Sequence, residues 1–176
     1  MACSKKKERK ITIDTPRPLT NLDITADRPV QSLQTENTVS YSYNQPDTWH
    51  KQQPTSFRKI NFTFGTAGEI YLSESRGGIL PNANRWLGQF GADAITSIDQ
   101  LEKIPLLSGT GYLVSATGSF KGMRMAHPVD NYKLLGALIE IDGELITIKM
   151  TGPSAEVSNQ ELSFRTFCSS LKSNPQ

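Results

Sequence analysis

Cysteine and histidine are scarce: the chain has two of each among its 176 residues. Cys3 and Cys168 lie near opposite ends, and Cys3 falls in a polar N-terminal segment, so we expect no disulfide. His50 and His127 are far apart in the sequence, and neither has a second candidate ligand beside it. Because metal sites are built from clustered His, Cys or carboxylate side chains, the sequence predicts no metal centre.

Long hydrophobic runs are also absent. No apolar stretch approaches the ~20 residues that a membrane-spanning helix requires. The net charge is only +2, and residues 1–10 alone hold five basic side chains and one acidic side chain. The rest of the chain is therefore close to neutral, which argues against a nucleic-acid-binding domain with a basic face. We expect no nucleic-acid partner.

Recognisable catalytic patterns are missing as well. No Gly-x-Ser-x-Gly nucleophile elbow occurs in the chain. The segment Gly109-Thr110-Gly111 lacks the third glycine and the following helix of a dinucleotide-binding loop, so it predicts a turn. The acidic residues around the predicted hairpin tip at 140–144 are expected to be solvated. The sequence thus favours a protein without catalytic activity and without a cofactor.

Part of the chain has little to bury. Hydrophobic residues make up 36% of it, which is low for a fully globular protein. Residues 11–37 mix Thr, Pro, Asp and Gln with isolated Ile and Leu, without a helical or strand period. Such a segment cannot offset the entropy of its own ordering. We predict a disordered basic and polar tether over residues 1–40 and a single α+β domain over residues 41–176.

The start of the chain admits a sharper interpretation. Ala2-Cys3-Ser4 resembles the end of a bacterial lipoprotein signal, in which a small residue precedes the cysteine that receives lipid. The resemblance implies that Cys3 is the lipid attachment site and that residues 4–40 form the spacer behind it. Ser4, rather than an aspartate, implies sorting to the outer membrane. The alternative is a cytoplasmic protein with an ordinary basic start, because charge follows Ser4 at once and no intact signal peptide is present.

Alternation of apolar and polar residues predicts an antiparallel sheet. The strongest hairpin spans residues 134–150, because Asp142-Gly143 is the two-residue turn that matches the twist of paired strands. Trp49 follows the turn at Pro46-Asp47 and is expected to pack against the sheet. The other predicted segments are a strand at 39–43, a hairpin of 57–64 with 69–73, a strand at 112–116 and a loop at 118–130.

The segment from Gly77 to Gly91 predicts the central helix. Pro81 suits a first helical turn, and Gly91 is placed to end the helix. Apolar residues recur with the spacing of one buried helical face; they are Ala83, Trp86, Leu87 and Phe90. We expect this amphipathic helix to dock on the sheet through Trp86.

Two more helices are predicted. A short helix is expected over residues 97–103, with Thr96 or Ser97 as its cap and Pro105 after its end. For the C-terminal helix, Ser158 with Glu161 predicts a capping box, and Val157 with Leu162 predicts a hydrophobic staple. The buried face of this helix is expected to comprise Phe164, Phe167, Cys168 and Leu171.

The order of these elements resembles the PsbP-like α/β/α sandwich, an α+β fold in which helices cover an antiparallel sheet. The resemblance covers about residues 41–172 and rests on the strand before Trp49, the central helix, the strong hairpin and the C-terminal helix ending at Ser170-Leu171. The segments 77–89 and 149–153 are similar to uncharacterised bacterial lipoproteins. The photosystem-binding and metal-binding residues of PsbP itself do not map onto this chain.

Polar residues on the central helix are the candidate binding site. Amide and guanidinium groups on a rigid helix are suited to bind a carboxylate, a phosphate or a peptide backbone. The candidates are Asn82, Asn84, Arg85 and Gln89, joined by Lys149 and Thr151 if that strand end lies beside the helix. The alternative is structural, with Arg85 and Asn84 bonding the carbonyl groups of the loop at 77–82.

These patterns favour a non-catalytic binding or protein-interaction module, attached by lipid to the cell envelope at the outer membrane and facing the periplasm. Its partner is an unknown protein or small ligand. One alternative is a small hydrolase, which requires a hydroxyl group close to His50 or His127. The other is a cytoplasmic adaptor.

Overall fold

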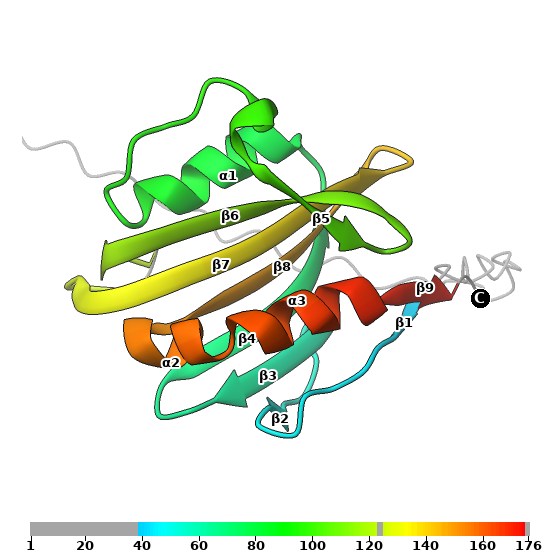
Figure 1. The fold of residues 1–176 in the computed structure, drawn as a ribbon, viewed down its shortest axis with the longest axis horizontal. Helices are drawn as coiled ribbons and strands as arrows, with labels where there is room; N and C mark the ends of the chain where they lie inside the picture. Colours follow the sequence, from blue (N-terminus) through cyan, green and yellow to red (C-terminus); the bar gives the residue numbers. More distant parts are fainter. Residues whose placement is uncertain (1–38, 123–124, 175–176) are drawn as a thin grey trace, which may run out of the picture. The chain divides into compact units, whose positions relative to one another are not determined.

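The computed structural model describes residues 39–122 and 125–174. Residues 1–38, which include Cys3 and nearly all of the predicted tether, lie outside the described residues. Seven strands form one antiparallel sheet in the order β2-β3-β4-β8-β7-β6-β5 (Figure 1). Their bounds are β2 His50–Lys51, β3 Ile60–Phe64, β4 Gly68–Ser75, β5 Glu102–Leu106, β6 Gly109–Phe120, β7 Val129–Ile141 and β8 Glu144–Pro153. The short strands β1 (Ser40–Ser42) and β9 (Lys172–Asn174) pair separately.

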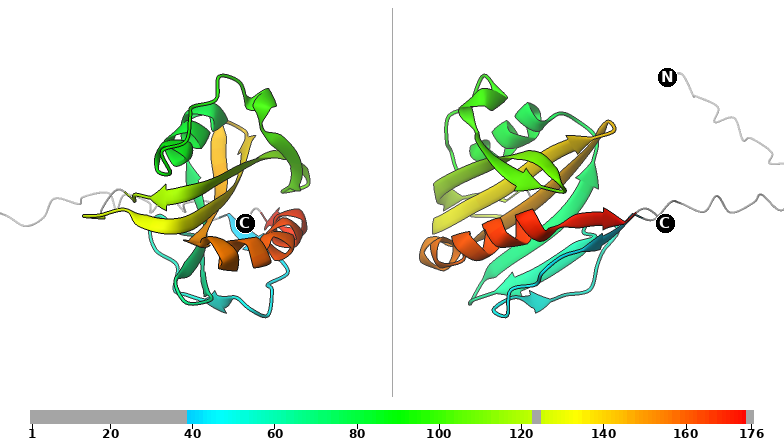
Figure 2. Two further views of the ribbon diagram at one scale, coloured as in Figure 1. Left: turned by 60° about the vertical axis from the view of Figure 1, so that its left-hand side comes forward. Right: turned by 45° about the vertical axis from the view of Figure 1, so that its right-hand side comes forward.

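Helices cover both faces of the seven-stranded sheet, so the predicted α/β/α sandwich is confirmed. Helix α1 (Ile79–Gly88) packs on one face, and α2 (Ser154–Asn159) and α3 (Glu161–Ser170) pack on the other (Figure 2). Because successive strand residues point to opposite faces, each strand contributes to two separate cores. The helices therefore stabilise the sheet from two sides.

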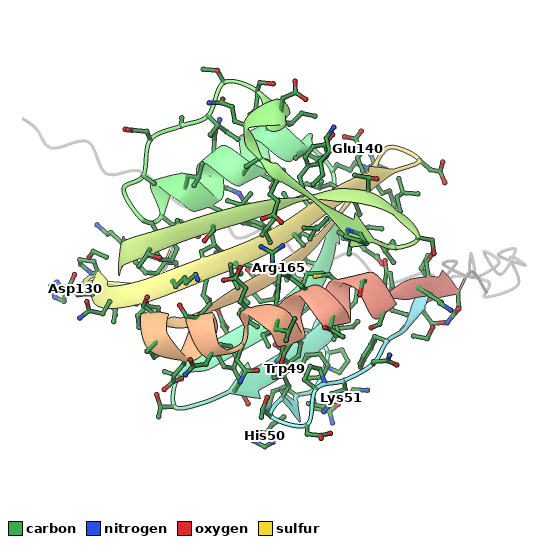
Figure 3. All side chains as sticks on the ribbon, viewed as in Figure 1. Trp49, His50, Lys51, Asp130, Glu140 and Arg165 are labelled. Atoms are coloured by element: carbon green, nitrogen blue, oxygen red, sulfur yellow. The ribbon has the colours of Figure 1, made fainter. Side chains whose placement is uncertain are left out.

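The core under α3 is largely aromatic. The rings of Trp49, Phe62 and Phe167 meet with centroids 5.2 to 5.9 Å apart, and Tyr43 lies 5.2 Å from Phe167. Trp49 is 1% exposed, as its position after the turn predicts, and its Nε1 donates a hydrogen bond to Gln160 Oε1 at 2.9 Å (Figure 3). The predicted inward faces of β3 and β4 and the predicted buried face of α3 all lie in this core.

The core under α1 is built around Trp86. This side chain is 3% exposed and lies across β7 at Gly136, where a Cβ atom would overlap the Trp86 ring. Glycine at this position lets the indole approach the backbone directly. The rest of this core comes from α1, the turn after it, β6, β7 and β8 and comprises Ala83, Leu87, Phe90, Val114, Ala116, Leu134, Leu138 and Leu145.

The hairpin around Asp142-Gly143 is confirmed and is longer than predicted. Both turn residues have positive φ, 52° at Asp142 and 80° at Gly143, as a two-residue hairpin turn requires. The predicted loop at 118–130 is wrong at both ends, because β6 continues to Phe120 and β7 begins at Val129. A register shift between Gly118 and Phe120 allows β6 to continue past the glycine.

The predicted helix at 97–103 is also wrong beyond its first turn. Ser97 does form the expected cap with Gln100, but the helical turn is 3₁₀ and ends there. Glu102–Leu106 is instead the edge strand β5, where a proline is tolerated because one side of the strand forms no ladder. The turn that follows is at Leu107-Ser108, with φ of 50° and 62°, and the predicted turn at Gly109–Gly111 belongs to β6.

The predicted cap of the C-terminal helix does not form. Ser158 lies inside α2, and α3 begins at Glu161 without a side-chain cap. Leu162 is 78% exposed, so it cannot act as a hydrophobic staple. The buried face of α3 is nevertheless as predicted, because that face depends on helical spacing and not on the residue at which the helix begins.

Candidate functional site

Helix α1 packs on β6 and β7 and leaves the adjoining half of the same sheet face polar. We call this half the polar face; it comprises Asn61, Thr63, Glu69, Tyr71, Ser73, Thr147, Lys149 and Thr151. On β4 and β8, Glu69 lies opposite Thr151, and Tyr71 lies opposite Lys149. Residues directly opposite each other in a ladder share a face, so the register gathers these side chains beside α1.

Lys149 connects the polar face to the end of α1. It is only 5% exposed, and its Nζ donates a hydrogen bond to Gln89 Oε1 at 2.6 Å. The same Nζ lies 5.6 Å from the ring centroid of Trp86 and 5.5 Å from that of Phe120. Burial lowers the pKa of Lys149 to about 8, against the opposing effect of the Glu69 charge. Within the described residues no carboxylate forms an ion pair with this ammonium group.

Arg85 borders a surface groove next to Lys149. The groove has a volume of about 350 Å³ and lies between α1, β4, β8 and the residues before β3. Its lining comprises Phe57, Arg58, Tyr71, Ser73, Glu74, Ser75, Arg85, Trp86 and Thr147. One Nη2 hydrogen bond, 2.7 Å to Asn82 Oδ1, holds the Arg85 guanidinium. In the described part of the chain, Arg85 is likewise without a carboxylate partner.

The other charges at the groove are neutralised locally. Arg58 pairs with Glu69 at 3.0 Å and lies over the Tyr71 ring, 4.1 Å from its centroid. Glu74 accepts a hydrogen bond from the Tyr41 hydroxyl at 2.6 Å and pairs with Lys59 at 3.6 Å. Of the described residues considered at the groove, Arg85 and Lys149 are therefore the positive charges without a carboxylate ion-pair partner.

The two asparagines of the predicted site have structural partners. Asn84 uses both ends of its amide on one residue: Nδ2 donates to the Ile95 carbonyl at 2.9 Å, and Oδ1 accepts from the Ile95 N–H at 2.8 Å. Asn82 Nδ2 donates to the Gly78 carbonyl at 3.0 Å. Asn84 thus fastens the loop after α1, and Asn82 fastens the loop before it and orients Arg85.

The structure therefore brings four of the six predicted residues together. Gln89 contacts Lys149 directly, Arg85 lies on the same side of α1, and Thr151 is buried beside Glu69, to which its hydroxyl donates at 3.4 Å. Asn82 supports this group through Arg85, whereas Asn84 bonds a different loop. A role in binding stays a prediction for all six. Cys3 lies outside the described residues.

Sequence reasoning missed much of the groove lining, namely Arg58 before β3 and the strand residues Tyr71, Ser73 and Thr147. A signal was present: the alternate positions of 69–73 and of 147–151 are all polar, whereas the positions between them are apolar. Alternation of this kind predicts one buried face and one polar face for each strand. Only the pairing of β4 with β8 shows that the two polar faces are continuous.

A second charged cluster, on the α3 side, has a different character. Arg165 on α3 donates to Glu102 on β5 at 2.6 and 2.9 Å and to Glu161 at 3.1 Å (Figure 3). Lys133 on β7 also pairs with Glu161 at 3.1 Å. The hydrogen bond from Arg165 lowers the pKa of Glu102, and those from Lys133 and Arg165 lower the pKa of Glu161. These charges compensate one another and fasten α3 to the sheet edge.

The described residues give little support for metal binding, histidine-based hydrolysis or a reactive thiol. They contain no group of three or more His, Cys, Asp or Glu side chains that could hold a metal ion. His50 is exposed on the edge strand β2, His127 is exposed, and neither imidazole bonds a hydroxyl group within the described ranges (Figure 3). Burial raises the pKa of the Cys168 thiol to about 12, so it is a packing residue. Of the described helices, none is both long and apolar enough to span a bilayer.

Comparison with known proteins gives similarity in structure only. No family description and no curated protein matches the sequence. LpqN of Mycobacterium tuberculosis, a protein involved in cell envelope biogenesis, is 11% identical with a TM-score of 0.52, over 81% of this chain and 88% of LpqN. CyanoP, the PsbP of Synechocystis sp. PCC 6803, is 11% identical with a TM-score of 0.47, over 78% of this chain and 94% of CyanoP.

A protein from Bacteroides thetaiotaomicron is 12% identical with a TM-score of 0.47, over 77% of this chain but only 46% of that protein. The antiparallel sheet with helices on both faces is the α+β sandwich that the sequence predicts, and the chain shares this fold with LpqN. At these identities the likeness concerns the fold alone.

Proposed function

We propose that this protein is a non-catalytic binding module of the cell envelope, held at the outer membrane by lipid on Cys3 and facing the periplasm. Its binding site is the groove beside α1, with Arg85 and Lys149 as the charged groups and Gln89 as the group that positions Lys149. The partner is a small ligand or a protein that carries negative charge.

One observation carries the binding role: Lys149 is 5% exposed and, within the described part of the chain, has only a neutral amide as hydrogen-bond partner. Burying a charge without a counter-charge costs free energy, and an apolar side chain of similar size would pack there without that cost. The Arg165 cluster gives the contrast, because a purely structural charge in this same chain is matched by carboxylates. A negatively charged ligand in the adjoining groove would supply the counter-charge of Lys149. Such a ligand accounts for a buried lysine at this position.

Two observations support the envelope location. Ala2-Cys3-Ser4 has the pattern at which lipoproteins are modified, and a long polar segment follows it as a spacer. The structurally similar LpqN is involved in cell envelope biogenesis. A single acyl chain binds a membrane only marginally, so stable attachment requires the several chains of a lipidated cysteine or a second signal such as the basic residues of 5–10.

The experiment that tests this location compares the unaltered protein with a variant in which Cys3 is replaced. With the gene expressed in its own host during growth on a labelled fatty acid, the unaltered protein is expected to take up label and to sediment with outer membranes. Cys3→Ser is expected to lose the label and to leave the membrane fraction. Cys168→Ser is the matched control for label uptake, because Cys168 is buried in the core. Absence of label on the unaltered protein would contradict the anchor.

A further inference from the structure

The groove beside α1 has features that define the kind of ligand it accepts. We infer that it binds a small ligand with a carboxylate group and an apolar or aromatic body, the carboxylate lying on the guanidinium of Arg85. This inference deepens the proposed binding role and rests on it.

Arg85 provides the donors. Within the described residues it spends one hydrogen bond on Asn82, so the other N–H groups of its planar fork remain free to donate at the groove that it lines. That bond also fixes the direction of the fork, because Asn82 is itself held by the Gly78 carbonyl. A planar fork of N–H donors matches a carboxylate in two parallel hydrogen bonds. Lys149 adds a second positive charge, close enough to Arg85 for the two to interact electrostatically.

Tyr71 provides a further donor at the groove. Among the described residues its hydroxyl has no hydrogen-bond partner, and no buried side-chain nitrogen or oxygen there lacks one. The Tyr71 hydroxyl is therefore not fully enclosed, and its donor is free for a ligand. Partial burial raises the pKa of Tyr71, with Glu69 adding to the effect, so the hydroxyl stays protonated and can donate.

The side chains that line the groove indicate the chemical character of the rest of the ligand. Phe57, Tyr71 and Trp86 contribute aromatic surface, and Phe57 is 81% exposed although it is a large apolar residue. Ser73 and Thr147 also line the groove and satisfy each other, with their hydroxyl oxygens 2.9 Å apart. These two hydroxyl groups therefore demand no hydrogen bonds from a ligand, and an apolar body fits against them.

The experiment measures binding to the full chain by calorimetry, with N-acetyl-phenylalanine as the probe and N-acetyl-phenylalanine amide as its matched neutral partner. The acid is expected to bind and the amide to bind at least about tenfold more weakly, because a hydrogen bond to a charged group is lost. Two further arms identify the source of the carboxylate. A tetrapeptide with a free C-terminal phenylalanine is compared with the single amino acid, and inorganic phosphate is compared with both.

Arg85→Gln is expected to weaken binding of the acid about tenfold or more, and Tyr71→Phe to weaken it by a smaller factor. Arg85→Lys keeps the charge but not the fork and is expected to fall between Arg85→Gln and the unaltered chain. Lys103→Gln removes the same charge from an exposed position on β5 and is expected to change nothing. Tyr71→Phe tests the site even if an Arg85 variant misfolds.

Equal binding of acid and amide, no binding of either, or unchanged binding in Arg85→Gln would overturn the inference. Preference for inorganic phosphate over the acid would overturn the carboxylate assignment. Tighter binding of the tetrapeptide than of the amino acid would support the inference and identify a peptide C-terminus as the ligand. Lipid uptake at Cys3 is measured separately, so a failure here leaves the proposed location standing.

Discussion

Trp86→Ala is expected to lower the free energy of unfolding by about 3–5 kcal/mol, the usual cost of emptying a large aromatic site in a core. The reason is local: Trp86 is 3% exposed and fills the space above Gly136, where the sheet has no side chain of its own. No neighbouring residue can move into the cavity without leaving its own site on β6 or β7. The measurement is chemical denaturation of the full chain, followed by circular dichroism.

The control for Trp86→Ala is Phe57→Ala. Phe57 is also aromatic but is 81% exposed, so its removal is expected to change stability by no more than about 0.5 kcal/mol. A domain of this size has a total stability of about 5–15 kcal/mol, so the Trp86 variant loses a large share of it. A loss below about 1 kcal/mol in Trp86→Ala would contradict the docking of α1 by this residue.

Phe167→Ala is expected to cost a similar amount, about 3–5 kcal/mol, from the opposite face of the sheet. Phe167 is fully buried, and its ring contacts those of Tyr43, Trp49 and Phe62. Aromatic pairs add about 0.5–1.5 kcal/mol each beyond the buried area, so the truncation removes both packing and ring contacts. Thermal unfolding followed by calorimetry measures the loss.

Leu162→Ala is the control on the same helix. Leu162 is 78% exposed on α3, so the change leaves helix propensity nearly unaltered and empties no cavity. If Phe167→Ala were no more destabilising than Leu162→Ala, α3 would not be fastened by the aromatic core. The two truncations also probe the two faces separately, because Trp86 and Phe167 belong to different cores.

Several elements could be predicted from the sequence because their signals are local. The helix of Trp86 shows helical spacing over about two turns, and the hairpin at Asp142-Gly143 combines a two-residue turn with apolar alternation on both sides. The buried face of α3 was predicted for the same reason. Each of these patterns is decided by residues within about ten positions of one another.

The errors arose where a distant partner decides the structure. Glu102–Leu106 follows a genuine helix cap at Ser97, and only its pairing with β6 makes it a strand. Ser158 and Glu161 have the spacing of a capping box, yet α2 already includes Ser158. Leu162 is exposed, so the hydrophobic staple predicted between Val157 and Leu162 does not form.

The candidate site was predictable in part. The polar residues of α1 were identifiable on the helix, and Lys149 and Thr151 were predicted to join them if their strand end lay nearby. The contact of Gln89 with Lys149 joins residues 60 positions apart and depends on the sheet order. The groove could not be predicted, because it depends on the register of β4 against β8, and no local sequence pattern determines that register.

The measurement that tests this account most directly is the pKa of Lys149, followed by NMR of lysine side chains labelled at Cε, with Lys149→Met to assign the signal. One lysine is expected to titrate at a pKa of about 8, because burial under α1 disfavours its charged form. The unfolded chain then binds more protons than the folded chain between pH 8 and 10.5, so stability rises with pH across that interval. A Lys149 signal that titrates near 10.5, with the other lysines, would contradict a buried and uncompensated charge at the groove.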